Sequence, residues 1–172
     1  VMASRGSVIP LFIDQIKTGK PLTITDPEMT RFMMTLDNAV ELVLFAFKNG
    51  KQGEMFVQKA RATTVSVLAQ ALLELYDSKS PIQEIGIRHG EKKYETLVTS
   101  EEMVKANDLG NYYSIASDNR DLNYAPYFSE GNKNEVPSGE YNSDNTERLD
   151  VAKMKDLLMQ LPEIKNDPLI KL

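Results

Sequence analysis

Apolar residues recur in four stretches of the chain at the three- and four-residue spacing of amphipathic helices. In each stretch the apolar side chains fall on one face, as in helices that pack against a core. The predicted helices cover residues 8–16, 35–49, 64–76 and 151–161. Each begins beside a residue that can cap a helix by accepting a backbone hydrogen bond, namely Ser7, Thr35, Thr64 or Ser66, and Asp150.

Short alternating or β-branched runs predict strands between these helices. The predicted strands cover residues 22–25, 30–34, 54–57, 82–87 and 112–116. Residues 93–98 read as the opening of a helix, and residues 93–105 as one or two short helices. The sequence therefore predicts a mixed α/β fold with few strands.

The stretch 87–92 carries the clearest chemical signal. It joins the predicted strand 82–87 to the helix expected from residue 93, and helix N-termini bind anions through free backbone N–H groups and the helix dipole. Arg88 adds a planar, permanently charged group suited to phosphate or carboxylate. Glu91, three residues on, can fix Arg88 or accept a hydroxyl of a ligand. Taken alone, these residues favour a simpler interpretation, an exposed ion pair at a strand end.

Composition narrows the function classes. The 172 residues, 41% apolar and 26% charged, suffice for one soluble domain with a core. A net charge of −5 argues against nucleic-acid binding. The absence of cysteine excludes disulfides and thiol chemistry and fits a cytoplasmic location. One histidine, His89, argues against a multi-histidine metal site and a Ser-His-Asp triad, so we assign no metal ligands. No apolar run is long enough to predict a membrane span.

The composition divides the chain into three parts. Residues 1–117 hold the predicted strands, and residues 150–172 hold the last helix and the tail. Residues 118–149 form a loop-rich arm in which Asn, Asp, Ser, Gly and Pro are frequent, and so long a loop is unusual inside a compact domain. Aromatic residues in this arm suggest that it docks onto another surface; they are Tyr124, Tyr127, Phe128 and Tyr141.

Three arginines, Arg5, Arg31 and Arg88, lie in predicted loops or at strand edges, and each is flanked by small or hydroxyl residues. Two or three converging arginines can bind a diphosphate bidentately. Exposed arginines occur in most proteins, so this pattern indicates a diphosphate site only when the surrounding residues support it.

Those surrounding residues, 4–10, 23–32 and 86–92, resemble in order and spacing the C-terminal half of bacterial inverting UDP-N-acetylglucosamine 4,6-dehydratases. These enzymes are extended short-chain dehydrogenase/reductases of polysaccharide biosynthesis, and the chain looks most like the capsular polysaccharide type. The resemblance runs through most of residues 1–117, and residues 140–149 look like the family's C-terminal end. It implies the substrate-binding part of an extended short-chain dehydrogenase/reductase, with few strands plus helices, and with the Rossmann half missing.

The resemblance also implies roles for individual residues. Arg31 and Arg88 would face the diphosphate of the substrate, and Glu91 would reach the ribose of uridine. Lys59 would lie in the segment that contacts uridine. The loop that lines the nucleotide-sugar pocket would contribute Arg5, Ser7 and Val8.

Two hallmarks of the family are absent from this sequence. Neither the Gly-rich dinucleotide fingerprint of a βαβ unit nor a Tyr-x-x-x-Lys pair occurs. Residues 1–3 read as the end of a strand without a lead-in, so we expect a fragment that begins inside a larger domain. We therefore expect no catalytic residues and no cofactor in this chain. The intact enzyme would use NADP or NAD to oxidise C4 of the sugar, eliminate water across C5 and C6, and return the hydride with inversion at C5.

Two interpretations of function remain open. The chain is the part of a dehydratase that binds UDP-N-acetylglucosamine, inactive alone, or it is a non-catalytic module whose arm, residues 118–149, mediates homo-oligomerisation. A stand-alone nucleotide-binding protein is disfavoured because residues 1–3 read as the middle of a fold. The missing half also predicts free strand edges, and exposed apolar faces on the helices 35–49 and 64–76.

Overall fold

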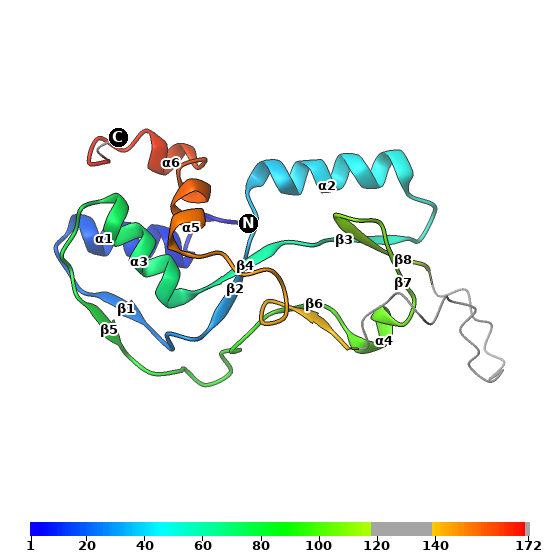
Figure 1. Cartoon of the computed structure of the whole chain (residues 1–172), viewed down its shortest axis with the longest axis horizontal. Helices are drawn as coiled ribbons and strands as arrows, with labels where there is room; N and C mark the ends of the chain where they lie inside the picture. Colours follow the sequence, from blue (N-terminus) through cyan, green and yellow to red (C-terminus); the bar gives the residue numbers. More distant parts are fainter. Residues whose placement is uncertain (118–138, 171–172) are drawn as a thin grey trace.

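The fold is mixed α/β, as the sequence predicts, and a computed structural model describes it for residues 1–117 and 139–170 (Figure 1). The described helices are α1 (Val8–Lys17), α2 (Leu36–Asn49), α3 (Val65–Leu75), α4 (Ser100–Met103), α5 (Val151–Leu158) and α6 (Pro162–Lys165). The described strands are β1 (Leu22–Ile24), β2 (Thr30–Met33), β3 (Met55–Gln58), β4 (Arg61–Thr64), β5 (Ile82–Glu84), β6 (Thr96–Val98), β7 (Ala106–Asp108), β8 (Tyr112–Ile115) and β9 (Tyr141–Asn142). None of these helices is both long and apolar enough to cross a membrane.

The strands pair in small sheets. Strands β1 and β5 are parallel, and the other described pairs, β2 with β4, β6 with β9, and β3–β8–β7, are antiparallel. The second edge of β4 is taken by the chain near Arg148, because the Ala62 N–H donates to the Glu147 carbonyl and the Ala62 carbonyl accepts from the Leu149 N–H. The C-terminal segment thus completes a sheet that the first 64 residues begin.

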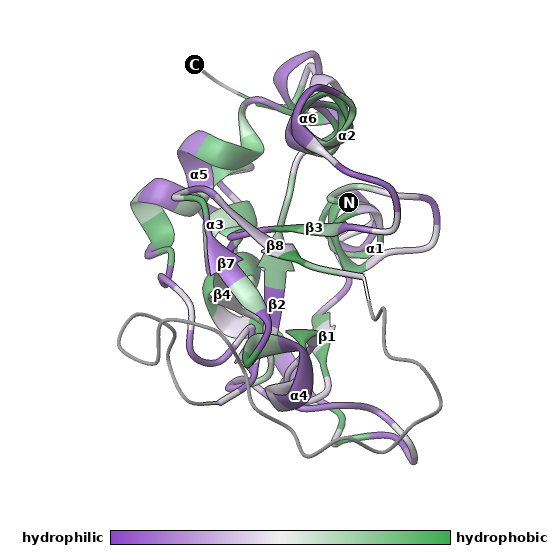
Figure 2. Ribbon diagram, turned by 90° about the vertical axis from the view of Figure 1, so that its right-hand side faces the viewer, coloured by the Kyte–Doolittle hydropathy of each residue, from purple (hydrophilic) through white to green (hydrophobic). Residues whose placement is uncertain are grey.

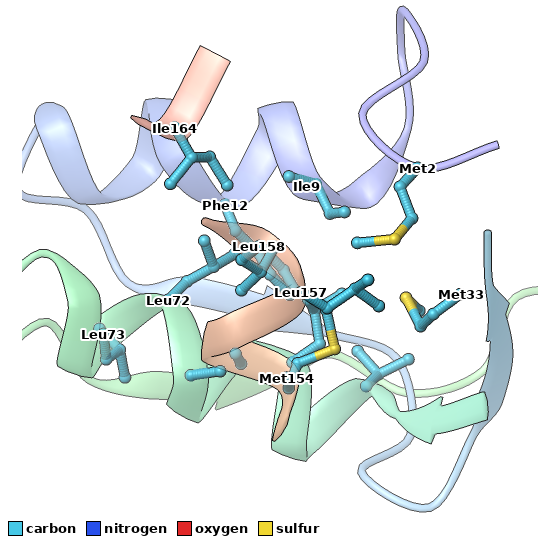
Figure 3. Close-up of a cluster of buried hydrophobic side chains, with 14 of the residues drawn as sticks. Met2, Ile9, Phe12, Met33, Leu72, Leu73, Met154, Leu157, Leu158 and Ile164 are labelled. Atoms are coloured by element: carbon cyan, nitrogen blue, oxygen red, sulfur yellow. The ribbon is translucent and has the colours of Figure 1, made fainter. Parts of the chain in front are cut away.

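The larger core lies between helices α1, α3 and α5, with β1 beside them (Figures 1 and 3). Figure 3 shows Phe12 of α1, Leu72 of α3 and Leu158 of α5 meeting in this cluster, and each of the three is fully buried. Tyr113, Tyr141 and Val57 belong to a smaller core between the antiparallel strands. The C-terminal helices are therefore an integral part of the larger core.

Three of the predicted helix caps are confirmed in detail. The Thr35 hydroxyl accepts a hydrogen bond from the Asn38 N–H, and the Asn38 side chain accepts one from the Thr35 N–H. Thr64 caps α3 by accepting from the Val67 N–H, and Asp150 caps α5 by accepting from the Lys153 N–H. Each cap satisfies an N–H group that has no partner inside the helix.

The stretch after the Arg88 turn does not form the predicted helix. Residues 96–98 form strand β6, which pairs with β9, and the Ser143 N–H donates to the Glu95 carbonyl at 2.8 Å. A partner strand from the C-terminal segment thus overrides the local preference for helix. Only the four-residue helix α4 lies within 93–105, capped by Thr99 and Glu102.

Three further sequence predictions need correction. Strand β4 was not predicted, because it forms only through pairing with β2 and with the segment around Arg148. The expected exposed apolar face of α3 is wrong, since α1 and α5 cover it. Residues 1–3 form a turn rather than a strand end, with Ala3 at φ 54° and the Met2 N–H donating to the Met34 carbonyl.

Helix α2 is attached differently from the other long helices. None of its residues is buried, and it lies along β3, away from the larger core (Figure 1). Figure 2 shows hydrophobic residues among hydrophilic ones along its ribbon. Leu36, Val43, Leu44 and Phe47 are each at least half exposed, so the predicted exposed apolar face of the helix 35–49 is confirmed.

The C-terminal segment is fastened to the helices by Asp167. Its carboxylate, nearly fully buried, forms an ion pair with Lys17 at the end of α1 and accepts a hydrogen bond from the Tyr76 hydroxyl at 2.8 Å. The hydrogen bond from Lys17 lowers the pKa of Asp167 below its ordinary value, against an opposing effect of burial. Burial raises the pKa of Tyr76, so the phenol stays a donor.

Candidate functional site

Two loops meet at the carboxyl end of the parallel strand pair β1–β5, where open α/β proteins place their ligands. The loop after β1 covers residues 25–29, and the loop after β5 covers residues 85–95. The Thr30 N–H donates to the Lys93 carbonyl at 2.9 Å, and the Lys93 ammonium lies 3.9 Å from the Asp26 carboxylate. These contacts hold the two loops side by side.

Arg31 ties these loops together. Its guanidinium donates to the Lys92 carbonyl at 3.0 Å, to the Lys93 carbonyl at 3.4 Å and to its neighbour's carbonyl, that of Thr30, at 2.7 Å. Its Nε lies 3.8 Å from the Glu95 carboxylate, and its side chain is only a quarter exposed. The structure thus gives Arg31 a tethering role within the chain.

Arg88 and Glu91 form a closed turn. The Glu91 N–H donates to the Arg88 carbonyl at 3.1 Å, and the Arg88 N–H donates to one Glu91 carboxylate oxygen at 3.3 Å. The other carboxylate oxygen accepts from the Thr25 hydroxyl at 3.4 Å. Gly90 has φ +81°, a value that side chains disfavour, so glycine allows this turn. Glu91 therefore fixes Arg88, one of the two roles the sequence suggested, but it does so through the Arg88 backbone N–H. The side-chain ion pair that these residues alone favoured is not found among the described residues.

The turn carries two cations that the rest of the described chain leaves free. Arg88 and Lys92 are exposed, and neither side chain has a hydrogen-bond or ion-pair partner within residues 1–117 and 139–170. No helix follows the turn, so the expected helix dipole does not contribute. Attraction of an anion here depends on the two side chains.

The loop with Arg5, Ser7 and Val8 contacts the opposite end of β2 from Arg31, through the Met2 N–H and the Met34 carbonyl. Arg5 is exposed and has no ion-pair or hydrogen-bond partner in the described chain. Ser7 precedes α1 in extended conformation, but its buried hydroxyl makes no capping bond and has no partner among the described residues. Val8 packs against the larger core.

Lys59 lies on the β3–β8–β7 sheet rather than at the two loops. Its ammonium is 2.6 Å from the Asp108 carboxylate and 4.4 Å from the centre of the Tyr113 ring. The hydrogen bond from Lys59 lowers the pKa of Asp108. The charge of Lys59 is therefore already balanced within the chain. Arg31, Arg88 and Glu91 are brought together, whereas Lys59 and the Arg5 loop contact other strands.

Ser143 is a residue of the site that sequence reasoning did not single out. Its fully buried hydroxyl lies 2.8 Å from the Thr30 hydroxyl, donates to the Thr30 carbonyl at 3.2 Å and accepts from the Glu95 N–H at 2.9 Å. Ser143, which lies in the C-terminal segment, thus holds Thr30 and Glu95, the residues on either side of Arg31, in place. Only its place in the segment 140–149, which resembles the family's C-terminal end, hinted at a role.

The described residues do not fit a metal or a dinucleotide. They contain no group of three or more acidic, histidine or cysteine side chains that could hold a metal ion. A dinucleotide needs a glycine-rich turn from a strand into a helix. None of the described connections from a strand to the next helix contains glycine. β2–α2, β4–α3 and β6–α4 pass through threonine, and β9–α5 passes through residues 143–150.

Comparisons with known proteins match nearly the whole chain. A family model described as polysaccharide biosynthesis protein matches residues 1–117, and one described as polysaccharide biosynthesis protein C-terminal matches residues 118–165. Proteins named UDP-glucose 4-epimerase from Rickettsia felis and Rickettsia typhi are each 58% identical over 167 residues, which is 97% of this chain and 49% of each relative. The chain thus spans about half the length of these curated relatives.

A solved structure supports the same likeness. The X-ray structure of Pen from Bacillus thuringiensis is 35% identical and has a TM-score of 0.76, over 94% of this chain and 46% of that one.

Proposed function

The chain belongs to the polysaccharide biosynthesis protein family, and on that premise we propose that it is the part of a nucleotide-sugar-modifying enzyme that holds the diphosphate of a UDP-sugar. Its mixed α/β fold is that expected for the C-terminal part of an extended short-chain dehydrogenase/reductase. The observation that carries the proposal is the pair of free cations, Arg88 and Lys92, on a turn fixed by Glu91 and Thr25.

Each side chain has a distinct part in this proposal. Arg88 binds the diphosphate as a fork, and Lys92 adds a point charge beside it. Arg31 shapes the turn by holding the Lys92 and Lys93 carbonyls, and Glu91 offers its carboxylate to the uridine ribose. Arg5, Ser7 and Val8 line the sugar side of the pocket when the rest of the enzyme is present, and Lys59 approaches uridine only on leaving Asp108.

The substrate we propose is UDP-N-acetylglucosamine, and the reaction of the intact enzyme is 4,6-dehydration with inversion at C5, a lyase reaction in capsular polysaccharide precursor synthesis. The resemblance of residues 4–10, 23–32 and 86–92 supports this reaction. The names of the rickettsial relatives favour the alternative, epimerisation at C4 of a UDP-sugar. A 4-keto-6-deoxy product supports the first, and a C4 epimer the second.

The proposal makes the chain inactive by itself. The catalytic residues and the NADP or NAD site of the intact enzyme would lie in a half that this chain does not include. The cofactor would supply oxidation and return of hydride at the sugar. The residues of this chain only bind and orient the nucleotide.

Calorimetric titration of the chain with UDP tests the proposal. We expect UDP to bind and uridine, which lacks the diphosphate, to bind at least about tenfold more weakly, a difference of roughly 1.4 kcal/mol. Arg88→Ala should lower UDP affinity by a similar factor. Lys79→Ala is the matched control, because Lys79 is an exposed cation just before β5, at the opposite end of the strand from Arg88. Equal UDP affinity of Arg88→Ala and the unaltered chain would contradict the proposal.

Homo-oligomerisation through the arm is the second candidate function. Tyr124, Tyr127 and Phe128 lie outside the described residues. Tyr141 is buried within the chain, where its hydroxyl donates to the Ala60 carbonyl at 2.9 Å. Deleting residues 118–138 should lower the mass measured by light scattering if the arm joins subunits, and an unchanged mass would rule this out.

A further inference from the structure

Met29 lies where the larger core reaches the loop after β1. Its side chain is 1% exposed and belongs to the larger core. Both of its backbone groups are engaged, since its N–H donates to the Asp26 carbonyl at 3.2 Å and its carbonyl accepts from the Val65 N–H at 2.9 Å. Met29 is therefore held in place by its backbone and its packing, independently of its sulfur atom.

The sulfur atom of Met29 contacts both side chains that support the Arg88 turn. Nη2 of Arg31 donates to Sδ at 2.9 Å, and the Thr25 hydroxyl lies 3.5 Å from the same atom. Arg31 holds the carbonyls at the end of the turn, and Thr25 reaches the Glu91 carboxylate at 3.4 Å. One buried atom thus lies between the two side chains that fix the turn.

The bond to sulfur completes the hydrogen bonding of the Arg31 guanidinium. Its two terminal nitrogens carry four N–H groups, and these meet four acceptors, which are three backbone carbonyls and Sδ of Met29. Its Nε lies beside the Glu95 carboxylate at 3.8 Å. Because the donors of a guanidinium form a rigid fork, an acceptor on each of them holds Arg31 in one orientation.

Packing alone does not require this sulfur. Met33 lies four residues further along the chain in the same core, and its sulfur accepts no hydrogen bond from the described residues. Among the methionines of residues 1–117 and 139–170, only Met29 accepts one. Buried methionines ordinarily fill irregular space. A thioether placed 2.9 Å from a guanidinium nitrogen indicates a second role, that of orienting Arg31.

We propose that Met29 is a positioning residue of the diphosphate site: its thioether orients Arg31, and through Arg31 it holds the turn that carries Arg88 and Lys92. The inference rests on the proposed function, because it assigns that turn to the diphosphate. Met29 is buried and acts through Arg31 rather than on the ligand. A turn that is already fixed loses less conformational freedom when it binds a ligand.

Hydrogen exchange of two amides tests the positioning without any ligand. The Glu91 N–H bonds within the turn, and the Val65 N–H bonds to the Met29 carbonyl. Met29→Leu keeps the apolar volume and removes the acceptor, so the Glu91 amide should exchange at least about threefold faster while the Val65 amide is unchanged. Met33→Leu is the matched control and should alter neither rate. An unchanged Glu91 rate would overturn the inference, and so would equal acceleration of both amides, which would mean that only packing is disturbed.

Titration with UDP measures the consequence for binding. Met29→Leu should weaken UDP binding about three- to tenfold, whereas Met33→Leu should not. In an Arg31→Ala background, Met29→Leu should have no further effect, because the sulfur has lost its donor. Equal losses with and without Arg31 would show that Met29 does not act through it. Failure of the unaltered chain to bind UDP would contradict the proposed function, and the exchange rates would still decide whether Met29 positions the turn.

Discussion

Helices α2 and α3 both carry a broad apolar face, yet one face is covered and the other is not. In α3, Leu68 and Leu72 are buried against α1 and α5. In α2, Val43 and Phe47 are exposed, and only the Phe45 side touches the rest of the described chain. The two sequences predict the same kind of helix, so amphipathicity shows that a face will be covered without showing by what.

The largest expected difference between the two helices comes from truncating an apolar side chain in each. Leu72→Ala empties a fully buried position and should lower the free energy of unfolding by about 2–5 kcal/mol. Val43→Ala, at a half-exposed position, should change it by less than about 0.5 kcal/mol. Urea unfolding followed by circular dichroism measures both. Similar losses in the two variants would mean that the apolar face of α2 is covered in solution.

A second, smaller effect concerns Asp167, which joins the C-terminal segment to helices α1 and α3. Asp167→Asn removes the charge that pairs with Lys17 and weakens the hydrogen bond from Tyr76, and should lower the free energy of unfolding at neutral pH by about 1–3 kcal/mol. Tyr76→Phe, which removes only the phenol hydroxyl, should cost less. A loss in Tyr76→Phe that equals or exceeds that in Asp167→Asn would show that the ion pair contributes nothing.

These contacts of Asp167 also predict that the free energy of unfolding depends on pH. Because the pKa of Asp167 is lowered in the folded chain, chiefly by Lys17, its contribution is complete above the ordinary aspartate pKa near 4 and is lost as the pH falls through the lower folded value. The difference in unfolding free energy between the unaltered chain and Asp167→Asn should therefore shrink below about pH 4. Titrating urea midpoints of both proteins measures this, and a difference independent of pH would contradict it.

The smallest expected effect comes from removing the cap of each helix. Thr35→Ala and Thr64→Ala each remove a hydroxyl that accepts the third N–H of a helix, a loss of about 1 kcal/mol. For α3 this loss should lower the global unfolding midpoint. For α2, which is held on one face, it should instead speed hydrogen exchange of the α2 amides and leave the midpoint nearly unchanged. Equal shifts in midpoint would show that α2 unfolds together with the larger core.

The parts of the fold that local sequence encodes were predictable. Thr35, Thr64 and Asp150 mark helix starts through contacts only three residues away. Strand β6 was mistaken for a helix, because its partner β9 lies more than 40 residues further along the chain. Pairing across such distances leaves no local pattern.

The candidate site divides in the same way. The contact between Arg88 and Glu91 spans three residues, and the sequence suggested it, although as an ion pair and not as the backbone hydrogen bond that forms. The bond from Thr25 to Glu91 spans 66 residues, and the contact of Thr30 with Ser143 spans 113. The family resemblance implies that Arg31 faces the diphosphate, which stays a prediction. Its bonds to carbonyls of the chain, such as that of Lys92, are contacts that no sequence pattern reveals.

The contact between Thr30 and Ser143 also delays part of the folding during translation, because Ser143 is synthesised long after Thr30. Translation adds roughly 5–20 residues each second, so the 113 residues between the two take about 6–23 s to synthesise. During that interval the loops around Arg31 lack the hydroxyl that fixes them. The Arg88 turn thus leaves the ribosome before Ser143, the residue whose hydroxyl fixes the loops beside it.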